Sequence, residues 1–482
     1  MNLTSINRSA LMLLLLASSA STTDAWMMPS IQRVATTANT NTALSAIRKA
    51  GFGCSDAKSI DAAISESIAL AKKEMASSNG GSGDDDITMA FISCAATQDV
   101  ASIQKGFASR LPGVPMHGIT SSGGILTKQK GLQENAVGCL LLSADAGDFV
   151  TSFDAEDAKR AVQQLEEKGS VFATEDSSTP YQAIFMSATP GMEEGVIDAI
   201  EDAFPGIPIY GGTAADNDLS GKWMVFGSGP DACGGTGISL VGISSNVELG
   251  ASMIGPYTPT ERTVTATKTE GRRVHELNGQ PAADWVYNEW LGDEVKEAYE
   301  NGGLILGQTA QRPIAFEVCV QNQEGKLGLR GRLRKLLSGR KKSTTPAAQP
   351  EYVTAHLAAL GGPDEKFVDF FTPIPEGSEL TIMDSGNGPS TGYTSALVNA
   401  YDVAASAMGS AKTPKAGILV YCGGMAIAVG DQLNDGLMST LYQDRLKTMP
   451  MMGMTCFGEQ TCLPQSKTNV QRNLSVGMVL FG

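Results

Sequence analysis

Residues 204–217 read Phe-Pro-Gly-Ile-Pro-Ile-Tyr-Gly-Gly-Thr-Ala-Ala-Asp-Asn and contain the pattern Pro-x-x-Gly-x-Thr. The same pattern occurs twice more, and a pattern that recurs along a chain is the signature of an internally repeated fold. The three copies are Pro115-Gly118-Thr120, Pro208-Gly211-Thr213 and Pro450-Gly453-Thr455.

Each copy has the same surroundings. A short run of β-forming residues lies upstream, a helix-like stretch such as 192–204 comes next, and another β-like run such as 224–227 follows the motif. The sequence therefore predicts an α/β fold, with α+β as the alternative. Repeated β-α-β-β units are expected to form mixed sheets with packed helices in two pseudo-related domains. The upstream runs are 87–92, 183–186 and 417–421.

We interpret the three motifs as turns at strand ends, where open α/β sheets commonly hold their ligands. Glycine permits a positive φ and a close approach of the backbone, and exposed backbone N–H groups can bind an anion. A neighbouring threonine hydroxyl adds a donor and an acceptor. The alternative is that the turns serve only the fold.

Two segments are the strongest candidates for ligand contacts. In the segment 211–217, backbone N–H groups could face an anion and Asp216 an ammonium, so both ends of an amino acid could be held. Glu459 follows a glycine and could bind a ligand amine. The predicted ligand-binding residues are Thr120, Ser121, Gly211, Gly212, Thr213, Asp216, Asn217, Cys422, Thr455, Gly458, Glu459 and Asn473.

The sequence contains no recognisable catalytic set. It has no phosphate loop, no G-x-S-x-G and no H-E-x-x-H, and its three histidines (His117, His275 and His356) are widely separated. We therefore expect no catalytic residue, metal or cofactor. The alternatives are an enzyme that uses Cys422 as a nucleophile or Glu459 as a general base, and a protein-interaction scaffold.

Charge and hydropathy limit the partners. A net charge of −15 argues against general affinity for nucleic acid or anionic membranes. No segment has about 20 uninterrupted apolar residues, so no transmembrane helix is expected. The one basic segment, 326–342, is interpreted as part of a surface insertion, with an acidic partner or membrane as the alternative.

The first 47 residues have the composition of targeting sequences. Arg8 precedes the apolar run 11–16, and small residues follow up to Ala25, which predicts a signal peptide over 1–25. The segment 26–47 is rich in Ser, Thr and Ala and has no acidic residue, which is typical of a transit peptide. The combination resembles the bipartite plastid (chloroplast) presequence of diatoms and related algae. Secretion is the alternative, and it would favour a disulfide between Cys456 and Cys462.

Several segments together resemble the FIST family (F-box and intracellular signal transduction). They are 204–217, 237–242, 274–279, 351–353, 375–380, 419–423, 453–459 and 473–475, so the resemblance covers about residues 85 to 482. It implies a FIST N-like domain at 48–255, a linking region at 256–350 with a basic insertion at 326–350, and a FIST C-like domain at 351–482.

The resemblance implies a sensory or signalling module for a small polar ligand, amino acids among them, with a protein partner as a further option. Some relatives are fused to an output domain or an F-box, and neither is expected here. The family commonly has arginines where this chain has Met425 and the segment Thr354-Ala355-His356. If those arginines hold a ligand carboxylate, the ligand of this protein differs or is lost.

Overall fold

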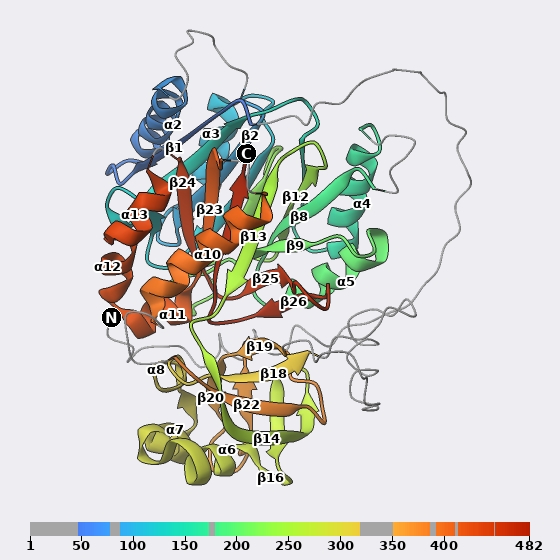
Figure 1. Cartoon of the computed structure of the whole chain (residues 1–482), viewed down its shortest axis with the longest axis vertical. Coiled ribbons are helices and arrows are strands. Elements are labelled where there is room, and N and C mark those ends of the chain that lie inside the picture. Colours follow the sequence, from blue (N-terminus) through green and yellow to red (C-terminus); the bar gives the residue numbers. More distant parts are fainter. Residues whose placement is uncertain are drawn as a thin grey trace, which may run out of the picture.

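The computed structural model describes residues 47–77, 87–172, 179–318, 350–385, 392–409, 413–447 and 449–482 (Figure 1). The predicted signal peptide, the predicted transit peptide except Ile47, and the basic insertion except Pro350 lie outside these ranges. Within them, no helix has both the length and the apolar character needed to cross a bilayer.

The larger body, which we call the ring, consists of three units with the same order of elements: strand, helix, strand, helix, strand, hairpin, strand. Unit 1 contains β1 (Lys49–Ser55), α2 (Ile60–Ser77), β2 (Met89–Ala95), α3 (Val100–Arg110), β3 (Met116–Ser121), β4 (Ile125–Thr127), β5 (Gly131–Gln133) and β6 (Val137–Ser143). Unit 2 contains β7 (Phe149–Asp154), α4 (Ala158–Gly169), β8 (Tyr181–Ala188), α5 (Glu193–Ala203), β9 (Ile209–Gly212), β10 (Val225–Gly227), β11 (Cys233–Gly234) and β12 (Ile238–Ser244).

Unit 3 has the same plan, but its first strand and first helix are far apart in the sequence, and its second helix is replaced by three short ones. It contains β13 (Leu249–Ile254), α10 (Tyr393–Ala407), β23 (Ala416–Cys422), α11 (Gly423–Val429), α12 (Gln432–Met438), α13 (Thr440–Leu446), β24 (Met451–Cys456), β25 (Glu459–Cys462), β26 (Asn469–Arg472) and β27 (Val476–Phe481).

Each unit is the main part of one six-stranded sheet. In each sheet two adjacent strands are parallel: β2 with β3, β8 with β9, and β23 with β24. The other pairings are antiparallel, so the sheets are mixed. Helices cover their outer faces (Figure 1). The prediction of an α/β fold with mixed sheets and packed helices is confirmed.

The hairpins are exchanged between units in a cyclic order. The hairpin of unit 2 (β10–β11) extends the sheet of unit 1 beside β3, and the hairpin of unit 3 (β25–β26) extends the sheet of unit 2 beside β9. The hairpin of unit 1 (β4–β5) extends the sheet of unit 3 beside β24. Three sheets thus close into a ring with pseudo-threefold symmetry.

The glycines of the three motifs lie in strands, so the interpretation of the motifs as turns is wrong. Each glycine is opposite a residue of the exchanged hairpin: Gly118 pairs with Phe226, Gly211 with Gln460 and Gly453 with Leu126. A Cβ atom at Gly118 would lie 2.0 Å from Cε2 of Phe226. A Cβ at Gly453 would lie 2.5 Å from Cβ of Leu126. At Gly118 and Gly453 glycine is needed because the incoming hairpin packs against the bare backbone. At Gly211 a Cβ would instead lie 1.8 Å from the carbonyl oxygen of Met186 on β8.

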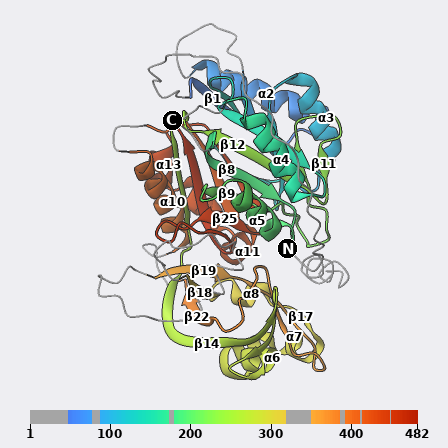
Figure 2. The same ribbon diagram turned by 90° about the vertical axis from the view of Figure 1, so that its right-hand side faces the viewer.

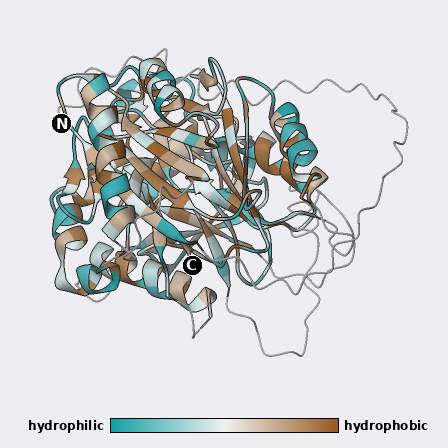
Figure 3. Ribbon diagram, turned by 90° about the horizontal axis from the view of Figure 1, so that it is seen from above, coloured by the Kyte–Doolittle hydropathy of each residue, from teal (hydrophilic) through white to brown (hydrophobic). Residues whose placement is uncertain are grey.

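The inner faces of the three sheets share one apolar core. The rings of Phe91, Phe185 and Phe481, one from each unit, lie close together, with centroids 5.6 Å apart for Phe91 and Phe185 and 5.9 Å apart for Phe91 and Phe481. Seen from above, the central strands are mostly hydrophobic, whereas the peripheral helices carry hydrophilic residues (Figure 3). Burial of these large side chains supplies the main driving force for closing the ring.

A second body, the inserted domain, interrupts unit 3 between β13 and α10 (Figures 1 and 2). It has a nine-stranded sheet and its own core. The predicted segments 256–350 and 351–482 meet between β18 and β19, which pair with each other in this sheet. The elements are β14 (Thr258–Glu270), β15 (Arg273–Leu277), β16 (Gln280–Pro281), α6 (Ala282–Trp285), helical turns over Val286–Leu291 and Gly292–Val295, α7 (Lys296–Asn301), β17 (Gly303–Leu304), α8 (Leu306–Thr309), β18 (Ile314–Val318), β19 (Glu351–Ala355), β20 (Leu357–Leu360), β21 (Val368–Phe370) and β22 (Glu379–Asp384).

A candidate ligand site on the axis of the ring

The three motif threonines meet around the pseudo-threefold axis. The N–H of Ser122 donates to the carbonyl of Thr455 at 3.2 Å, that of Ala215 to Thr120 at 3.1 Å, and that of Phe457 to Thr213 at 3.2 Å. Each donor lies two residues after its own threonine, so the three hydrogen bonds form a closed cycle. The cycle lies at the carboxyl ends of the parallel strands, where α/β sheets commonly bind ligands.

The threonine hydroxyls themselves join neighbouring elements and are buried. Oγ1 of Thr120 accepts from the N–H of Met224 at 2.9 Å. Oγ1 of Thr455 lies 2.9 Å from Oγ of Ser121. Oγ1 of Thr213 donates to Glu193 at 3.1 Å and accepts from Gln460 at 2.8 Å. The hydroxyls therefore stabilise the packing of neighbouring elements.

A small pocket lies between the axial end of the ring and the inserted domain, and we call it the axial pocket. Its volume is about 40 Å³. Four predicted site residues line it (Asp216, Asn217, Cys422 and Asn473), while Thr120, Ser121, Gly211, Gly212, Thr213, Thr455, Gly458 and Glu459 are not among its lining residues. The lining is completed by Ser122, Asp218, Leu219, Gly424, Ile427 and Phe457 of the ring and by Leu306, His356 and Phe371 of the inserted domain.

The carboxylate of Asp216 is used within its own loop. Oδ1 accepts from the N–H of Leu219 at 2.7 Å, and Oδ2 accepts from the N–H groups of Gly221 and Lys222 at 2.8 and 2.9 Å. The side chain is 1% exposed. These bonds fix the loop 217–222 at the pocket edge, and a contact of Asp216 with a ligand ammonium stays a prediction.

The two asparagines connect different parts of the chain. Oδ1 of Asn217 accepts from the N–H of Gly123 at 2.7 Å and so joins unit 2 to unit 1. Oδ1 of Asn473 accepts from the N–H of His356 at 3.2 Å, and its Nδ2 donates to the carbonyl of Phe457 at 3.4 Å. Asn473 therefore joins the inserted domain to the end of the ring.

His356 presents a neutral imidazole to the pocket. Burial lowers the pKa of His356 to about 4, and its Nε2 lies 3.1 Å from the carbonyl of Leu306, which requires the proton on Nε2. The unprotonated Nδ1 faces Gly424, where a Cβ atom would lie only 2.8 Å away. In the sequence, His356 is part of the segment where the family commonly has arginine. Nothing in the sequence indicates that it lies against Gly424.

Cys422 and Glu459 lie next to each other and are buried. Sγ of Cys422 accepts from the N–H of Leu474 at 3.2 Å, and burial raises the pKa of the Cys422 thiol. Oε2 of Glu459 accepts from the N–H and the hydroxyl of Ser475 at 3.1 and 2.8 Å, while burial raises the pKa of Glu459 to about 8. A nucleophilic cysteine needs a thiolate, and these surroundings favour the thiol.

The hairpin β25–β26 carries a buried polar cluster, of which the sequence predicted only Glu459. Glu459 is paired across the hairpin with Arg472, and Gln460 with Gln471. Burial lowers the pKa of Arg472. Four of their side-chain atoms have no hydrogen-bond partner among the described residues: Oε1 of Glu459, Oε1 of Gln460, Nε2 of Gln471 and Nε of Arg472. Such atoms commonly bind water or ligand groups. A run of polar residues in a short buried strand gives no warning of this in the sequence.

The cysteines of this region are free. Cys456 is buried in β24 opposite Cys422, and its side chain belongs to the central core. Cys462 is half-buried at the end of β25, and neither cysteine forms a disulfide. Cys319 lies outside the described residues. In the ranges that the structure describes, no group of three or more His, Cys, Asp or Glu side chains could hold a metal ion.

Two models of known protein families match the chain. A model of the FIST N domain matches residues 86–280, and a model of the FIST C domain matches residues 283–462. The two matched segments meet inside the inserted domain, between β16 and α6. No curated protein matches the chain. FIST domains are associated with signal transduction and small-ligand sensing. The chain, matched over most of its length, belongs to the FIST family.

Proposed function

We propose that this protein is a sensory module that binds a small polar ligand, with amino acids as the first class to test, in the axial pocket. The observation that carries the proposal is the composition of the pocket. Ring residues of all three units and three residues of the inserted domain line one space at the carboxyl ends of the parallel strands. A change of shape on ligand binding is the signal in this proposal.

The volume of the pocket implies movement. About 40 Å³ has room for about three water molecules, since one water needs about 10–15 Å³ of such space. A free amino acid is larger, so it enters only when Leu306, His356 and Phe371 move away from the ring. A ligand that binds the open arrangement shifts the population towards it.

The inserted domain is held to the ring by separate polar contacts. Nη2 of Arg272 binds Glu193 and Glu194 of α5. Oε1 and Oε2 of Glu351 accept from the N–H groups of Gln465 and Ser466, each at 2.7 Å. The hydrogen bonds of Glu351 can be exchanged for water with little net loss, which suits a domain that changes position.

A thermal-shift screen of the full chain with the twenty amino acids and small polar metabolites tests the proposal. A ligand at 100 times its dissociation constant adds about 2.7 kcal/mol to the free energy of unfolding. Gly424→Ala places a methyl group against Nδ1 of His356 and Asp218→Asn removes a charge at the pocket rim, so both variants should lose the shift.

Asp231→Asn is the matched control, because Asp231 lies on the hairpin of unit 2 and is 80% exposed. It should keep the full shift. If no compound stabilises the chain, or if Gly424→Ala keeps the response, the axial pocket is not the ligand site.

We also propose that residues 1–47 direct the protein to the plastid, on the composition of that segment. A fusion of residues 1–47 to a fluorescent protein in a diatom should give plastid fluorescence. Fluorescent protein in the medium would instead identify a secreted protein.

A further inference from the structure

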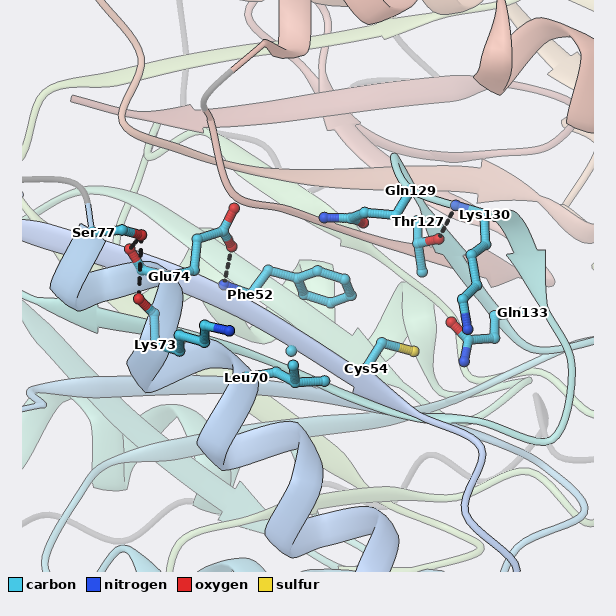
Figure 4. A pocket seen from close by; sticks show the side chains of 11 residues that line it. Phe52, Cys54, Leu70, Lys73, Glu74, Ser77, Thr127, Gln129, Lys130 and Gln133 are labelled. Carbon is cyan, nitrogen blue, oxygen red and sulfur yellow. Dashed lines mark hydrogen bonds between the residues drawn. The ribbon is translucent and has the colours of Figure 1, made fainter.

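A second and larger pocket, which we call the lateral pocket, lies on the side of the ring. It shares no lining residue with the axial pocket. Its volume is about 410 Å³, within the range of small-molecule sites. It lies between β1 and α2 on one side and the hairpin β4–β5 on the other. Figure 4 shows the residues that line it: Phe52, Gly53, Cys54, Leu70, Lys73, Glu74, Ser77, Thr127, Gln129, Lys130 and Gln133.

Four polar side chains of this pocket are uncommitted. The side chains of Lys73, Gln129, Lys130 and Gln133 make no hydrogen bond or ion pair with any residue of the described ranges. Gln133 is only 8% exposed, and in Figure 4 its amide points into the pocket. The amide makes no hydrogen bond with the described residues and is not sealed off from solvent, so it is free to bind a water or a ligand group.

The uncommitted charges are both positive. Glu74 is the one carboxylate in the lining, and it is occupied: Oε2 accepts from the N–H of Phe52 at 2.8 Å, and Oε1 pairs with Nζ of Lys128 at 3.4 Å. Lys73 comes from α2 and Lys130 from the hairpin, and they lie on opposite sides of the pocket (Figure 4). The pocket is thus locally cationic in a protein whose net charge is −15.

Apolar surface lies between the two lysines. The ring of Phe52 and the thiol of Cys54 are in the middle of the pocket (Figure 4), and the side chain of Leu70 is 47% exposed beside them. Burial raises the pKa of Cys54 to about 12, so its thiol stays neutral and acts as a small apolar group.

From this arrangement we propose that the lateral pocket binds a small organic anion with two separate acidic groups, which we call a dianion for its two groups whatever the charge of a phosphate. One acidic group lies at Lys73 and the other at Lys130, the amide N–H groups of Gln129 and Gln133 donate to oxygen atoms of the ligand, and an apolar body lies on Phe52. Two carboxylates, or a carboxylate and a phosphate, share this chemistry. The proposal is independent of the function of the axial pocket.

Isothermal titration calorimetry of the full chain tests the proposal. The probes are succinate, glutarate and adipate, whose carboxylates lie progressively further apart, and 3-phosphoglycerate. Butyrate and inorganic phosphate serve as the single-anion controls. At least one dianion should bind at 1:1 stoichiometry and more tightly than both controls, and its affinity should fall with added NaCl. Tightest binding of a dicarboxylate or of 3-phosphoglycerate tells which acidic groups the site prefers.

Variants localise the binding. Lys73→Gln and Lys130→Gln should each weaken binding about tenfold, which corresponds to about 1.4 kcal/mol. Lys72→Gln removes the same charge from the neighbouring position of α2, outside the pocket lining, and should leave the affinity unchanged. Gln133→Leu should weaken binding without lowering the melting temperature, because it removes an amide that makes no hydrogen bond with the described residues of the protein.

Three results would overturn the proposal. They are the absence of saturable binding by all four dianions, equal binding of inorganic phosphate, and undiminished binding in the double variant Lys73→Gln, Lys130→Gln. Gly424→Ala, which blocks the axial pocket, should leave the dianion affinity intact, so failure of one site does not imply failure of the other.

Discussion

Nη2 of Arg272, in the inserted domain, lies 2.9 Å from Oε2 of Glu193, at the start of α5 in the ring. Both side chains are buried, with 6% and 2% of their surface exposed. Oε1 of the same carboxylate accepts from Thr213 of the axial cycle. One buried carboxylate therefore connects a motif threonine to the second body of the protein.

Arg272→Gln should be strongly destabilising, because it leaves the carboxylate of Glu193 buried without a full positive charge. Removal of one partner of a buried ion pair costs about 3–5 kcal/mol of unfolding free energy, which urea denaturation at pH 7 would measure. Lys105→Gln breaks the exposed pair between Lys105 and Asp231 and should change stability little. If the two substitutions lowered the unfolding free energy by similar amounts, the buried pair would contribute no more to stability than the exposed pair.

Gly118→Ala should disturb the exchange of hairpins. The new methyl group would meet the ring of Phe226 on β10, and an overpacked core position costs about 1–3 kcal/mol. Gly195→Ala, at an open position in the first turn of α5, should instead stabilise by about 0.4–1 kcal/mol. Thermal unfolding of both variants, with Phe226→Leu added to Gly118→Ala, checks the argument. The double variant should recover part of the loss; no recovery would place the strain elsewhere.

Stability should depend on pH through Glu459. Burial raises its pKa in the folded protein from the ordinary value of 4.5 to about 8, so the folded state binds the proton more tightly than the unfolded state. The stabilisation is complete below pH 4.5 and is lost as the pH rises through 8, by up to about 1.4 kcal/mol per pH unit.

Glu459→Gln should flatten the melting temperature of the protein between pH 4.5 and 8 relative to the unsubstituted chain. Above pH 8 the variant should be the more stable of the two, because it has no buried charge to accommodate. If the melting temperatures of the two proteins changed with pH in the same way, the pH dependence of stability would come from other groups.

Asn473→Ala should loosen the inserted domain. The substitution removes the acceptor for the N–H of His356 and the donor to Phe457, and a buried hydrogen-bonding group left without its partner costs about 1–3 kcal/mol. Hydrogen exchange at residues 351–357 should accelerate. Asn434→Ala, which removes an acceptor for the N–H of Leu132 inside the ring, should leave these amides unchanged. Equal acceleration in both variants would contradict a specific link.

Local patterns predicted the elements well. The helix expected at 192–204 is α5 (Glu193–Ala203), and the three β-α-β units around the motifs are present, because hydrophobic period and turn residues act over short distances. Thr120, Thr213 and Thr455, all predicted as ligand-binding residues, do meet in one cycle of hydrogen bonds, but none of them lines the axial pocket. The glycines were misread, because a glycine that admits a neighbouring strand has the same letter as one that makes a turn.

The pairing between distant segments could not be predicted from the sequence. Gly211 pairs with Gln460, and Arg272 binds Glu193, although long stretches of chain separate the partners. The start of unit 3 could not be recognised in the sequence, because the whole inserted domain lies between β13 and α10. Uncommitted side chains such as Gln133 become visible only once every possible partner has been placed.

The exchange of hairpins also decides how the protein comes apart. Each sheet of the ring is completed by a strand pair from another unit, so no unit can melt while the other two keep their full sheets. The core of the inserted domain consists mainly of its own residues, although Leu463 and Val470 of the unit 3 hairpin pack into it, so it depends less on the exchange of hairpins. Heating should therefore give one sharp calorimetric transition for all three units together, with a separate transition only for the body that interrupts the third.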